Sequence, residues 1–389
     1  MPRPNTAQSV ANGHPPKAVA GAGHVVEPEA LSVTHWFDTE PDGEPYAATI
    51  RFTGQRIGVH GKPGPRDSFV QDETVDGIVP GSGKVSLTTW VYGLEPGEWT
   101  VTANLIRGSR VAAAGGGKPS GAHTLPRAAW SWMRWAVSTD QFAPVKTRWG
   151  PLVRLARMPA VIHGSWPALL AVGILVGVAL QATLLARANV SVGLTLTVDL
   201  VSGLAGLIGA KLMYVLMRPR GAPRQSIAEG LTVDGFLLAA PAVAAVALLT
   251  LDVPIGLFLD ATAPGLFFGV AIGRLGCFLT GCCAGRCTRS RWGVWSSNRR
   301  VGARRMPTQL LESAAGLLIG VATTLVVLGF APAVPGTIFV AAFAVYVIVR
   351  QVLLRLRAEP HNPIRARLTA AAAGVVLLAD AVVLLVGAT

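Results

Sequence analysis

From Pro167 onward the chain is a succession of apolar stretches of about 20 residues, and this repeat constrains the fold more than any other feature. A stretch of that length crosses the ~30 Å hydrocarbon core of a bilayer as one α-helix. We therefore predict an all-α polytopic membrane bundle of about seven transmembrane helices over residues 166–389. The predicted spans are Pro167–Ala186, Leu194–Met217, Val233–Leu251, Ala263–Thr280, Thr308–Ala331, Gly336–Leu356 and Leu368–Val386.

The residues before the spans predict a different kind of structure. Residues 1–30 are rich in Pro, Gly and Ala and predict a disordered leader without a visible signal peptide. Residues 31–112 alternate short apolar runs with turns, which predicts a small all-β sandwich-like domain with strands at 46–52, 85–92 and 99–105. The corner L-x-P-G-x-W-x-V at 94–101 resembles strand corners of immunoglobulin and fibronectin III domains. We expect this domain to be structural or to dock a protein partner.

Charge is distributed unevenly along the chain. The net charge is +13 and mean hydropathy is +0.47; residues 1–165 carry a net of +3 and residues 166–389 a net of +10. A basic and apolar half favours anionic lipid headgroups over nucleic acid as a partner. Residues 113–165 mix Trp and Arg and predict a flexible, interfacial linker, with a packed soluble linker as the alternative.

Several polar side chains interrupt the predicted spans. Arg274 lies in an apolar run, where an arginine costs several kcal/mol unless it is paired. Lys211 and Tyr214 are three residues apart, as are Gln309 and Glu312, so each pair shares a helix face. Such groups at helix ends predict a cavity for an anionic, lipid-like substrate. The other polar residues of this set are Asp199, Asp234, Asp260 and Arg350.

The four cysteines are clustered as C-x4-C-C-x3-C at Cys277, Cys282, Cys283 and Cys287. They have three interpretations: small, polarizable packing residues; a reactive thiol activated by a neighbouring arginine; or a disulfide or metal site. The spacing lacks the two separated CxxC pairs of a zinc ribbon, so we predict no metal or other cofactor.

Four segments together resemble one family. They are GLIGAKLMYVL at 206–216, DATAPGLFFGVAIGRLGCFLTGCCAGR at 260–286, RRMPTQLLES at 304–313 and GTIFVAAFAVYVIVRQVLLRLR at 336–357. In this order they are similar to the motifs of the prolipoprotein diacylglyceryl transferases, whose signature GR-[IL]-GNFINGE-xx-GR precedes R-H-P-[ST]-Q-L-Y-E. The resemblance covers residues 166–389.

The resemblance implies a membrane transferase of the bacterial plasma membrane. This family moves a diacylglyceryl group from phosphatidylglycerol to the lipobox cysteine thiol of a prolipoprotein. It implies catalytic roles for Arg274, Arg350 and Asp234, with Arg274 holding the lipid phosphate. It implies substrate contacts by Lys211, Tyr214, Gly281, Arg286, Gln309 and Glu312.

The chain departs from the family pattern at polar positions. Cys277 replaces the signature asparagine, Cys282 replaces its glutamate, and Leu354 replaces a glutamate of the last motif. Lys211 replaces an arginine, which keeps the charge but loses the bidentate fork. These changes favour an alternative function: a non-catalytic membrane lipid-binding or scaffold protein with a partner-docking β domain. A small-molecule transporter is a third class, disfavoured because the two halves show no inverted repeat of broken spans.

Overall fold

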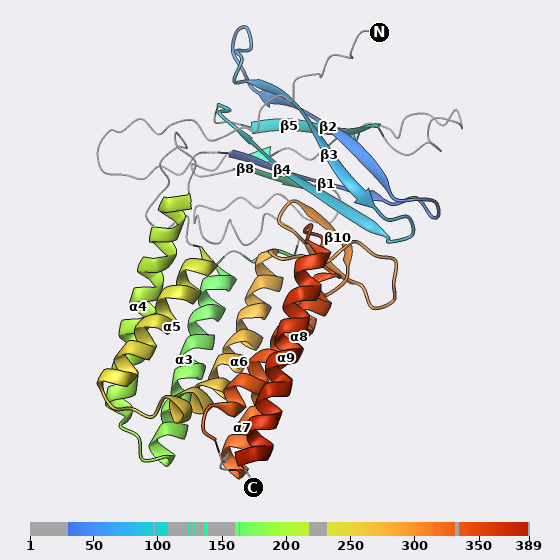
Figure 1. Cartoon of the computed structure of the whole chain (residues 1–389). Helices are drawn as coiled ribbons and strands as arrows, with labels where there is room; N and C mark the ends of the chain where they lie inside the picture. Colours follow the sequence, from blue (N-terminus) through green and yellow to red (C-terminus); the bar gives the residue numbers. More distant parts are fainter. Residues whose placement is uncertain are drawn as a thin grey trace, which may run out of the picture. The chain divides into compact units, whose positions relative to one another are not determined.

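The computed structural model describes residues 30–95, 98–107, 123–124, 128–129, 135–138, 160–162, 164–217, 232–330 and 334–387. The predicted leader (1–29), almost all of the Trp- and Arg-containing linker and the basic loop 218–231 lie outside these residues. The chain forms two compact units (Figure 1). One comprises Met1–Gly164 and Phe278–Pro307, and the other comprises Ser165–Cys277 and Thr308–Thr389.

The first unit contains two β-sheets. One has the strand order β8-β1-β4-β10-β9 and the other β3-β2-β5-β6, with β7 also pairing with β5. All pairs are antiparallel except β1 with β8. The strands are β1 (Ala30–Asp38), β2 (Tyr46–Ile57), β3 (Ser68–Ile78), β4 (Lys84–Tyr92), β5 (Glu98–Arg107), β6 (His123–Thr124), β7 (Ala128–Ala129), β8 (Trp135–Ser138), β9 (Val294–Ser297) and β10 (Val301–Arg305).

The two sheets share one hydrophobic core. Leu31 and Leu87 from the first sheet and Phe52 and Trp99 from the second are completely buried in it. Their alternation with exposed residues follows from the two-residue period of a strand. The prediction of an N-terminal β domain is confirmed, with the three predicted strands appearing as β2, β4 and β5.

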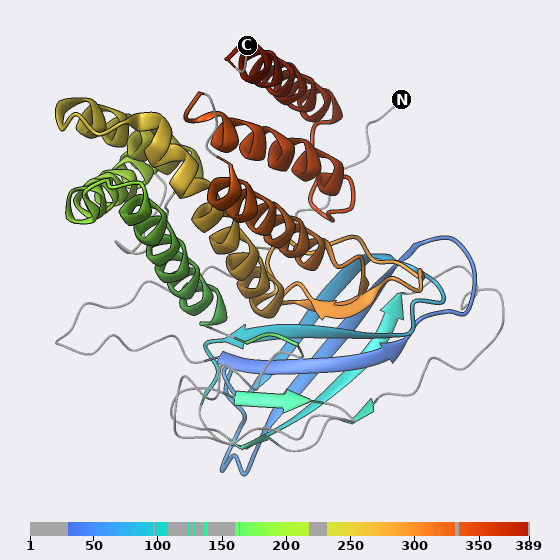
Figure 2. The same ribbon diagram turned by 90° about the horizontal axis from the view of Figure 1, so that it is seen from below.

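The hairpin β9–β10 was not predicted. It lies between two helices in the sequence, yet it belongs to the β unit, where β10 pairs with β4 beside it (Figure 2). Val301 and Ala303 of β10 are buried in the sandwich core. The hairpin is so short, and so rich in arginine, that its pattern resembles a basic loop.

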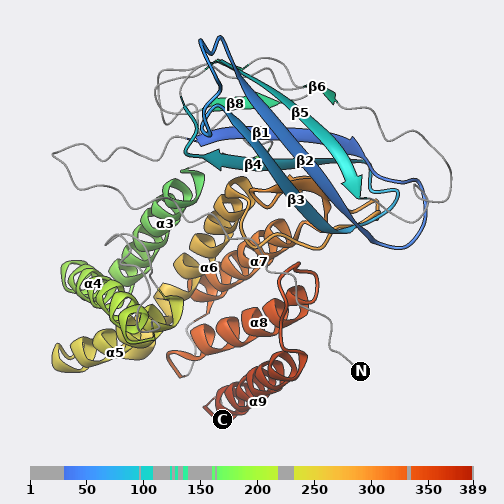
Figure 3. The same ribbon diagram turned by 90° about the horizontal axis from the view of Figure 1, so that it is seen from above.

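Within the described residues seven helices are present, as predicted, with β9 and β10 between the fourth and the fifth. They are α3 (Ser165–Arg187), α4 (Val192–Met217), α5 (Val233–Thr250), α6 (Ile255–Thr280), α7 (Thr308–Gly329), α8 (Thr337–Leu354) and α9 (Pro363–Gly387). All except α5 are long and apolar enough to cross a membrane, and α5 is counted as a shorter apolar helix, Asp234–Thr250. Within the bundle α4 lies along α5, and α8 along α9 (Figure 3).

Helix α6 begins at Ile255, eight residues before the predicted start at Ala263. Asp260 and Pro264 were interpreted as the opening of this span, but both lie inside the helix. The Asp260 carboxylate is buried, and its burial is compensated by hydrogen bonds that it accepts from the backbone N–H groups of Gly336 (2.7 Å) and Phe339 (3.0 Å). Asp260 therefore supplies the acceptors that the first turn of α8 lacks within its own helix.

Glycines bring α3 and α6 into close contact. A Cβ at Gly177 would lie 2.9 Å from the Gly265 carbonyl oxygen, and a Cβ at Gly173 would lie 3.0 Å from the Gly269 carbonyl oxygen. Small residues at matching positions let two helix backbones approach closely, which is how apolar helices pack strongly in a membrane.

Replacing Gly177 with Val is expected to separate these two helices. The added side chain has no room, so we expect a loss of about 1–3 kcal/mol in stability, seen as a lower thermal unfolding temperature in detergent. Gly203→Val in α4 is the matched control, because a Cβ there would meet nothing within 4 Å. Equal losses in the two variants would contradict the close α3–α6 contact.

Candidate active site

A buried carboxylate between two arginines forms the centre of the site. Glu312 lies in the first turns of α7. Its Oε2 forms an ion pair with Arg274 Nε of α6 at 2.6 Å, and its Oε1 accepts a hydrogen bond from Arg357 Nη2 at 2.8 Å. The Glu312 side chain is 1% exposed, while those of Arg274 and Arg357 are 15% and 8% exposed. The sequence predicted Arg274 and Glu312 as separate site residues, and the structure brings them together.

This triad carries one negative and two positive formal charges. Charges taken out of water are costly unless they are paired, so Glu312 makes it possible to hold both arginines in an apolar bundle. Arg357 also approaches the exposed Glu359, but only to 4.0 Å. The buried group retains an excess of positive charge, and such a group attracts an anion.

Helices α6 and α7 are packed tightly around the ion pair. The Ser313 hydroxyl donates a hydrogen bond to the Ala271 carbonyl at 2.7 Å. A Cβ at Gly316 would lie 3.1 Å from the Phe267 carbonyl oxygen. These contacts fix the separation of the two helices, and thereby the reach of Arg274 to Glu312.

Tyr346 of α8 joins the same group of side chains. Its hydroxyl interacts electrostatically with the Arg274 guanidinium, and its ring packs against Phe267 with centroids 5.5 Å apart. Arg350 lies four residues after Tyr346 on α8, and therefore on the same helix face. Within the part of the chain that the structure describes, Arg350 forms no ion pair.

Lys211, Tyr214 and Asp234 lie on the helix pair α4–α5. Lys211 Nζ lies 5.4 Å from the centroid of the Tyr214 ring, so the predicted shared helix face is confirmed. A Cβ at Gly235 would lie 2.8 Å from Ala210 Cα, so the first turn of α5 abuts the residue before Lys211. Asp234 is exposed in that turn, where a carboxylate favours the positive end of the helix dipole.

The glycine-rich end of the signature has a specific backbone geometry. Gly281 adopts a left-handed conformation (φ +71°), and a Cβ there would lie 2.6 Å from the Ser297 carbonyl oxygen, so only glycine fits. Arg305, which is buried, donates to the Gly285 carbonyl at 3.1 Å. Arg286 is exposed.

Gln309 is buried next to Thr308, whose hydroxyl donates to Gln309 Oε1 at 3.4 Å. Gln309 and Glu312 begin the same helix, as the sequence predicted.

An apolar cavity of about 410 Å³ lies between α7, α8 and α9. Along α7 it begins at Ile319, seven residues after Glu312, which is about 10 Å along a helix axis. Along α8 it reaches Val345, the neighbour of Tyr346. The lining residues are Ile319, Ala322, Thr323, Val326, Phe330, Thr337, Ile338, Ala341, Ala342, Val345 and Leu384.

Comparison with known proteins assigns this arrangement to a family. The pattern of the prolipoprotein diacylglyceryl transferases matches residues 157–386, more than half of the chain. The chain belongs to the prolipoprotein diacylglyceryl transferase family. It is also similar to the phosphatidylglycerol–prolipoprotein diacylglyceryl transferases of two strains of Dehalococcoides mccartyi, with 32% identity over 136 residues. The matched region covers 32% of this chain and 51% of each relative, so the chain spans about half the length of these curated relatives.

Two of the four cysteines, Cys277 and Cys282, stand at the positions that the family signature gives to an asparagine and a glutamate. None of the four forms a disulfide; Cys277 is buried in α6 at 7% exposure, and Cys282, Cys283 and Cys287 are half-buried. Cys283 adopts a left-handed conformation (φ +54°), which is uncommon for a residue with a side chain. Among the described residues no group of three or more His, Cys, Asp or Glu side chains could hold a metal ion.

Two members of the site were not predicted as site residues. Arg357 is the last arginine of the final family motif, and Tyr346 is the tyrosine four residues before Arg350. Both belong to motifs that the sequence shows: Tyr346 begins Y-x-x-x-R, and Arg357 closes the last motif. Sequence spacing alone did not show that they reach Glu312 and Arg274, because those partners belong to other helices.

Replacing Glu312 by Gln is expected to leave two buried guanidinium groups without their counter-ion. Breaking a buried pair in this way typically costs about 3–5 kcal/mol, so the unfolding temperature in detergent should fall strongly. Glu359→Gln is the control, because Glu359 is 63% exposed and only approaches Arg357. Unchanged stability of the Glu312 variant would contradict the central role of this carboxylate.

Proposed function

We propose that this chain is a membrane transferase that moves the diacylglyceryl group of phosphatidylglycerol to the lipobox cysteine thiol of a prolipoprotein. The observation that carries the proposal is the buried Arg274–Glu312–Arg357 group, to which α8 adds a further arginine, Arg350, one helical turn after Tyr346. Membership of the prolipoprotein diacylglyceryl transferase family supports the same reaction. The proposed location is the bacterial plasma membrane, and the reaction needs no cofactor.

The reaction requires stabilisation of a leaving phosphate. A sulfur–carbon bond forms between the acceptor thiol and the glyceryl carbon, while the bond from that carbon to the phosphate oxygen breaks. The electron pair leaves on the phosphate oxygen, and the thiol proton balances the charge of the released glycerol phosphate. Arginines held in a site that excludes water stabilise such developing charge more strongly than they would in solution.

Arg350 is the best candidate to contact the phosphate directly. Arg274 is committed to Glu312, whereas Arg350 has no ion-pair partner in the described residues. It lies four residues after Tyr346 on α8 and seven residues before Arg357, which follows α8 and forms the ion pair with Glu312. We therefore assign phosphate binding to Arg350, with Arg274 positioned by Glu312 as the second cation.

The apolar cavity supports a lipid as the substrate. Its volume falls within the range of about 300–1,000 Å³ that is usual for small-molecule sites. Along α7 the cavity begins about two turns after Glu312, and along α8 it reaches the residue next to Tyr346. A molecule with an anionic head and apolar tails would place its head at the arginines and one acyl chain among the apolar side chains.

Asp234 remains a proposed proton acceptor for the thiol. It lies exposed at the start of α5, where the family pattern has a histidine in some members. Lys211, on the neighbouring helix end, is proposed to contact the anionic substrate together with Tyr214. Gly281, Arg286 and Gln309 keep the substrate-contact roles that the family motifs imply.

Replacing Arg350 by Ala is expected to abolish most of the transfer. We expect the rate to fall about 100-fold or more, as when one stabilising donor of an anionic transition state is removed. The purified protein, in phosphatidylglycerol vesicles, would be assayed for diacylglyceryl transfer to a lipobox peptide. Arg355→Ala is the control, because Arg355 is exposed at the end of the same helix.

Full activity of the Arg350 variant would overturn the assignment of phosphate binding. Absence of transfer by the unmodified protein would overturn the transferase proposal itself.

A non-catalytic lipid-binding protein is the second candidate. The observation that favours it is the loss of polar signature groups at Cys277, Cys282 and Leu354. This alternative predicts that the unmodified protein binds phosphatidylglycerol vesicles through Arg350 but transfers nothing to the lipobox peptide. It also predicts that the β domain captures a protein partner.

A further inference from the structure

The hairpin β9–β10 connects two parts of the β unit that are far apart in the sequence. On one side β10 pairs with β4, at Val301 with Leu87 and Gly302 with Ser86. The Thr88 backbone N–H donates to the Arg300 carbonyl at 2.7 Å, which extends this pairing into the hairpin turn. The hairpin is thus a strand addition to the N-terminal sandwich from within the family region.

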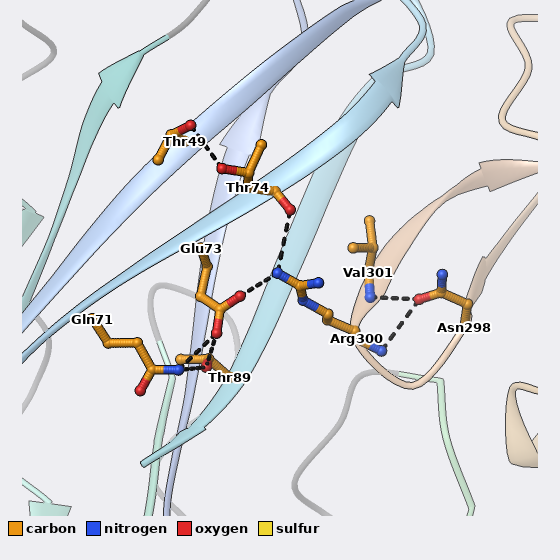
Figure 4. A network of polar contacts seen from close by, with 8 residues as sticks. All are labelled: Thr49, Gln71, Glu73, Thr74, Thr89, Asn298, Arg300 and Val301. Carbon is orange, nitrogen blue, oxygen red and sulfur yellow. Dashed lines mark hydrogen bonds and ion pairs between the residues drawn. The ribbon is translucent and has the colours of Figure 1, made fainter. Parts of the chain in front are cut away.

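Side chains reinforce the attachment of the hairpin to the sandwich. The Trp295 ring stacks on Trp36 with centroids 5.1 Å apart, and its indole N–H donates to the Lys84 carbonyl at 3.0 Å. The Arg300 guanidinium forms an ion pair with Glu73 of β3 and donates to the Thr74 carbonyl at 3.2 Å (Figure 4).

Glu73 is also held in place by contacts that do not involve Arg300. Its Oε1 accepts the Gln71 amide at 2.7 Å and the Thr89 hydroxyl at 2.8 Å, and its side chain is 17% exposed (Figure 4). The Asn298 side chain accepts the backbone N–H groups of Arg300 (3.2 Å) and Val301 (2.7 Å), which fixes the hairpin turn. This network is pre-organised on both sides of the ion pair, unlike an isolated surface pair, which contributes little.

The opposite side of the hairpin holds the end of the family signature. Arg299 Nε donates to the Thr280 carbonyl at 3.1 Å, and Gly281 packs directly on the Ser297 backbone. Further along, the Met306 N–H donates to the Arg286 carbonyl at 2.9 Å, and Cys287 forms a β-bridge with Arg305. The signature residues 280–287 are therefore bound to the hairpin at both of their ends.

We propose that the N-terminal β domain is a positioning module for the end of the signature, and that Glu73 and Arg300 are its polar anchor. The inference rests on the proposed transferase function for its effect on catalysis. Glu73 would act through Arg300 and the hairpin, not by touching the substrate. Arg274 belongs to α6, which ends at Thr280. The hairpin binds the chain at that end of α6, where the signature continues into residues 281–286.

The strand β3 provides a matched control in the residue next to Glu73. Asp72 points to the other face of the strand and forms an exposed pair with Arg51 of β2 at 2.7 Å. Glu73→Gln and Asp72→Asn therefore each remove one carboxylate charge from neighbouring positions. Only the first of them removes a contact to the hairpin.

The first readout is hydrogen exchange of the backbone amides in residues 278–287, which does not depend on turnover. In Glu73→Gln we expect this exchange to accelerate by roughly 5-fold or more, the effect of losing an interaction of ordinary strength. Arg300→Gln should give the same change, and the double variant should add nothing further because the two residues act as one unit. Asp72→Asn should leave the exchange as in the unmodified protein.

The second readout is diacylglyceryl transfer in phosphatidylglycerol vesicles. The Glu73 and Arg300 variants should lower kcat/KM by roughly 5-fold or more, since the segment that loosens carries Gly281 and Arg286, which are proposed to contact the substrate. Glu73→Asp, which keeps the charge, should restore part of kcat/KM.

Unchanged exchange at 278–287 in both single variants would overturn the proposal, as would equal acceleration in Asp72→Asn. If the unmodified protein shows no transfer, the transferase proposal fails while the exchange experiment still decides whether the β domain positions the signature.

Discussion

One carboxylate makes the charged centre of this apolar bundle possible. Glu312 neutralises part of the charge of Arg274 and Arg357, which reach it from α6 and from the segment after α8. Without it, two guanidinium groups would be buried side by side in a medium that solvates neither. The tight α6–α7 contact at Ser313 and the tyrosine on α8 are arranged around that requirement. The same Glu312 carboxylate therefore underlies both the positive electrostatic field of the site and the stability of the bundle.

Much of the fold could be predicted, because membrane-spanning helices are recognisable in a sequence by their length and hydropathy. The seven helices and the N-terminal strands β2, β4 and β5 follow from local patterns. The start of α6 could not be predicted, because a carboxylate inside an apolar helix needs a partner. The Asp260 carboxylate accepts hydrogen bonds from the backbone at the start of α8, which is distant in the sequence. The hairpin β9–β10 was missed for the same reason: its strand partner is β4, and no local pattern reveals a partner so far away.

The sequence proposed candidate site residues, but it could not show which of them contact one another. Family motifs identified Arg274, Glu312 and Arg350, while the structure added Arg357 and Tyr346 and showed which arginine is already paired. That distinction moves the proposed phosphate contact from Arg274 to Arg350. The cysteines attracted attention by their clustering, yet the residues that build the charged centre are spread over three helices and the segment after one of them.

The hairpin also has a consequence for the order of biosynthesis. Glu73 and Arg300 are 227 residues apart, and among the described helices α3–α6 are translated between the strands that finally pair. At usual rates of about 5–20 residues per second, β4 waits on the order of 10 to 40 s for its partner. During that interval its open edge could pair with other chains, the hazard that edge strands generally present. The sandwich can therefore be completed only after helices α3–α6 have been synthesised.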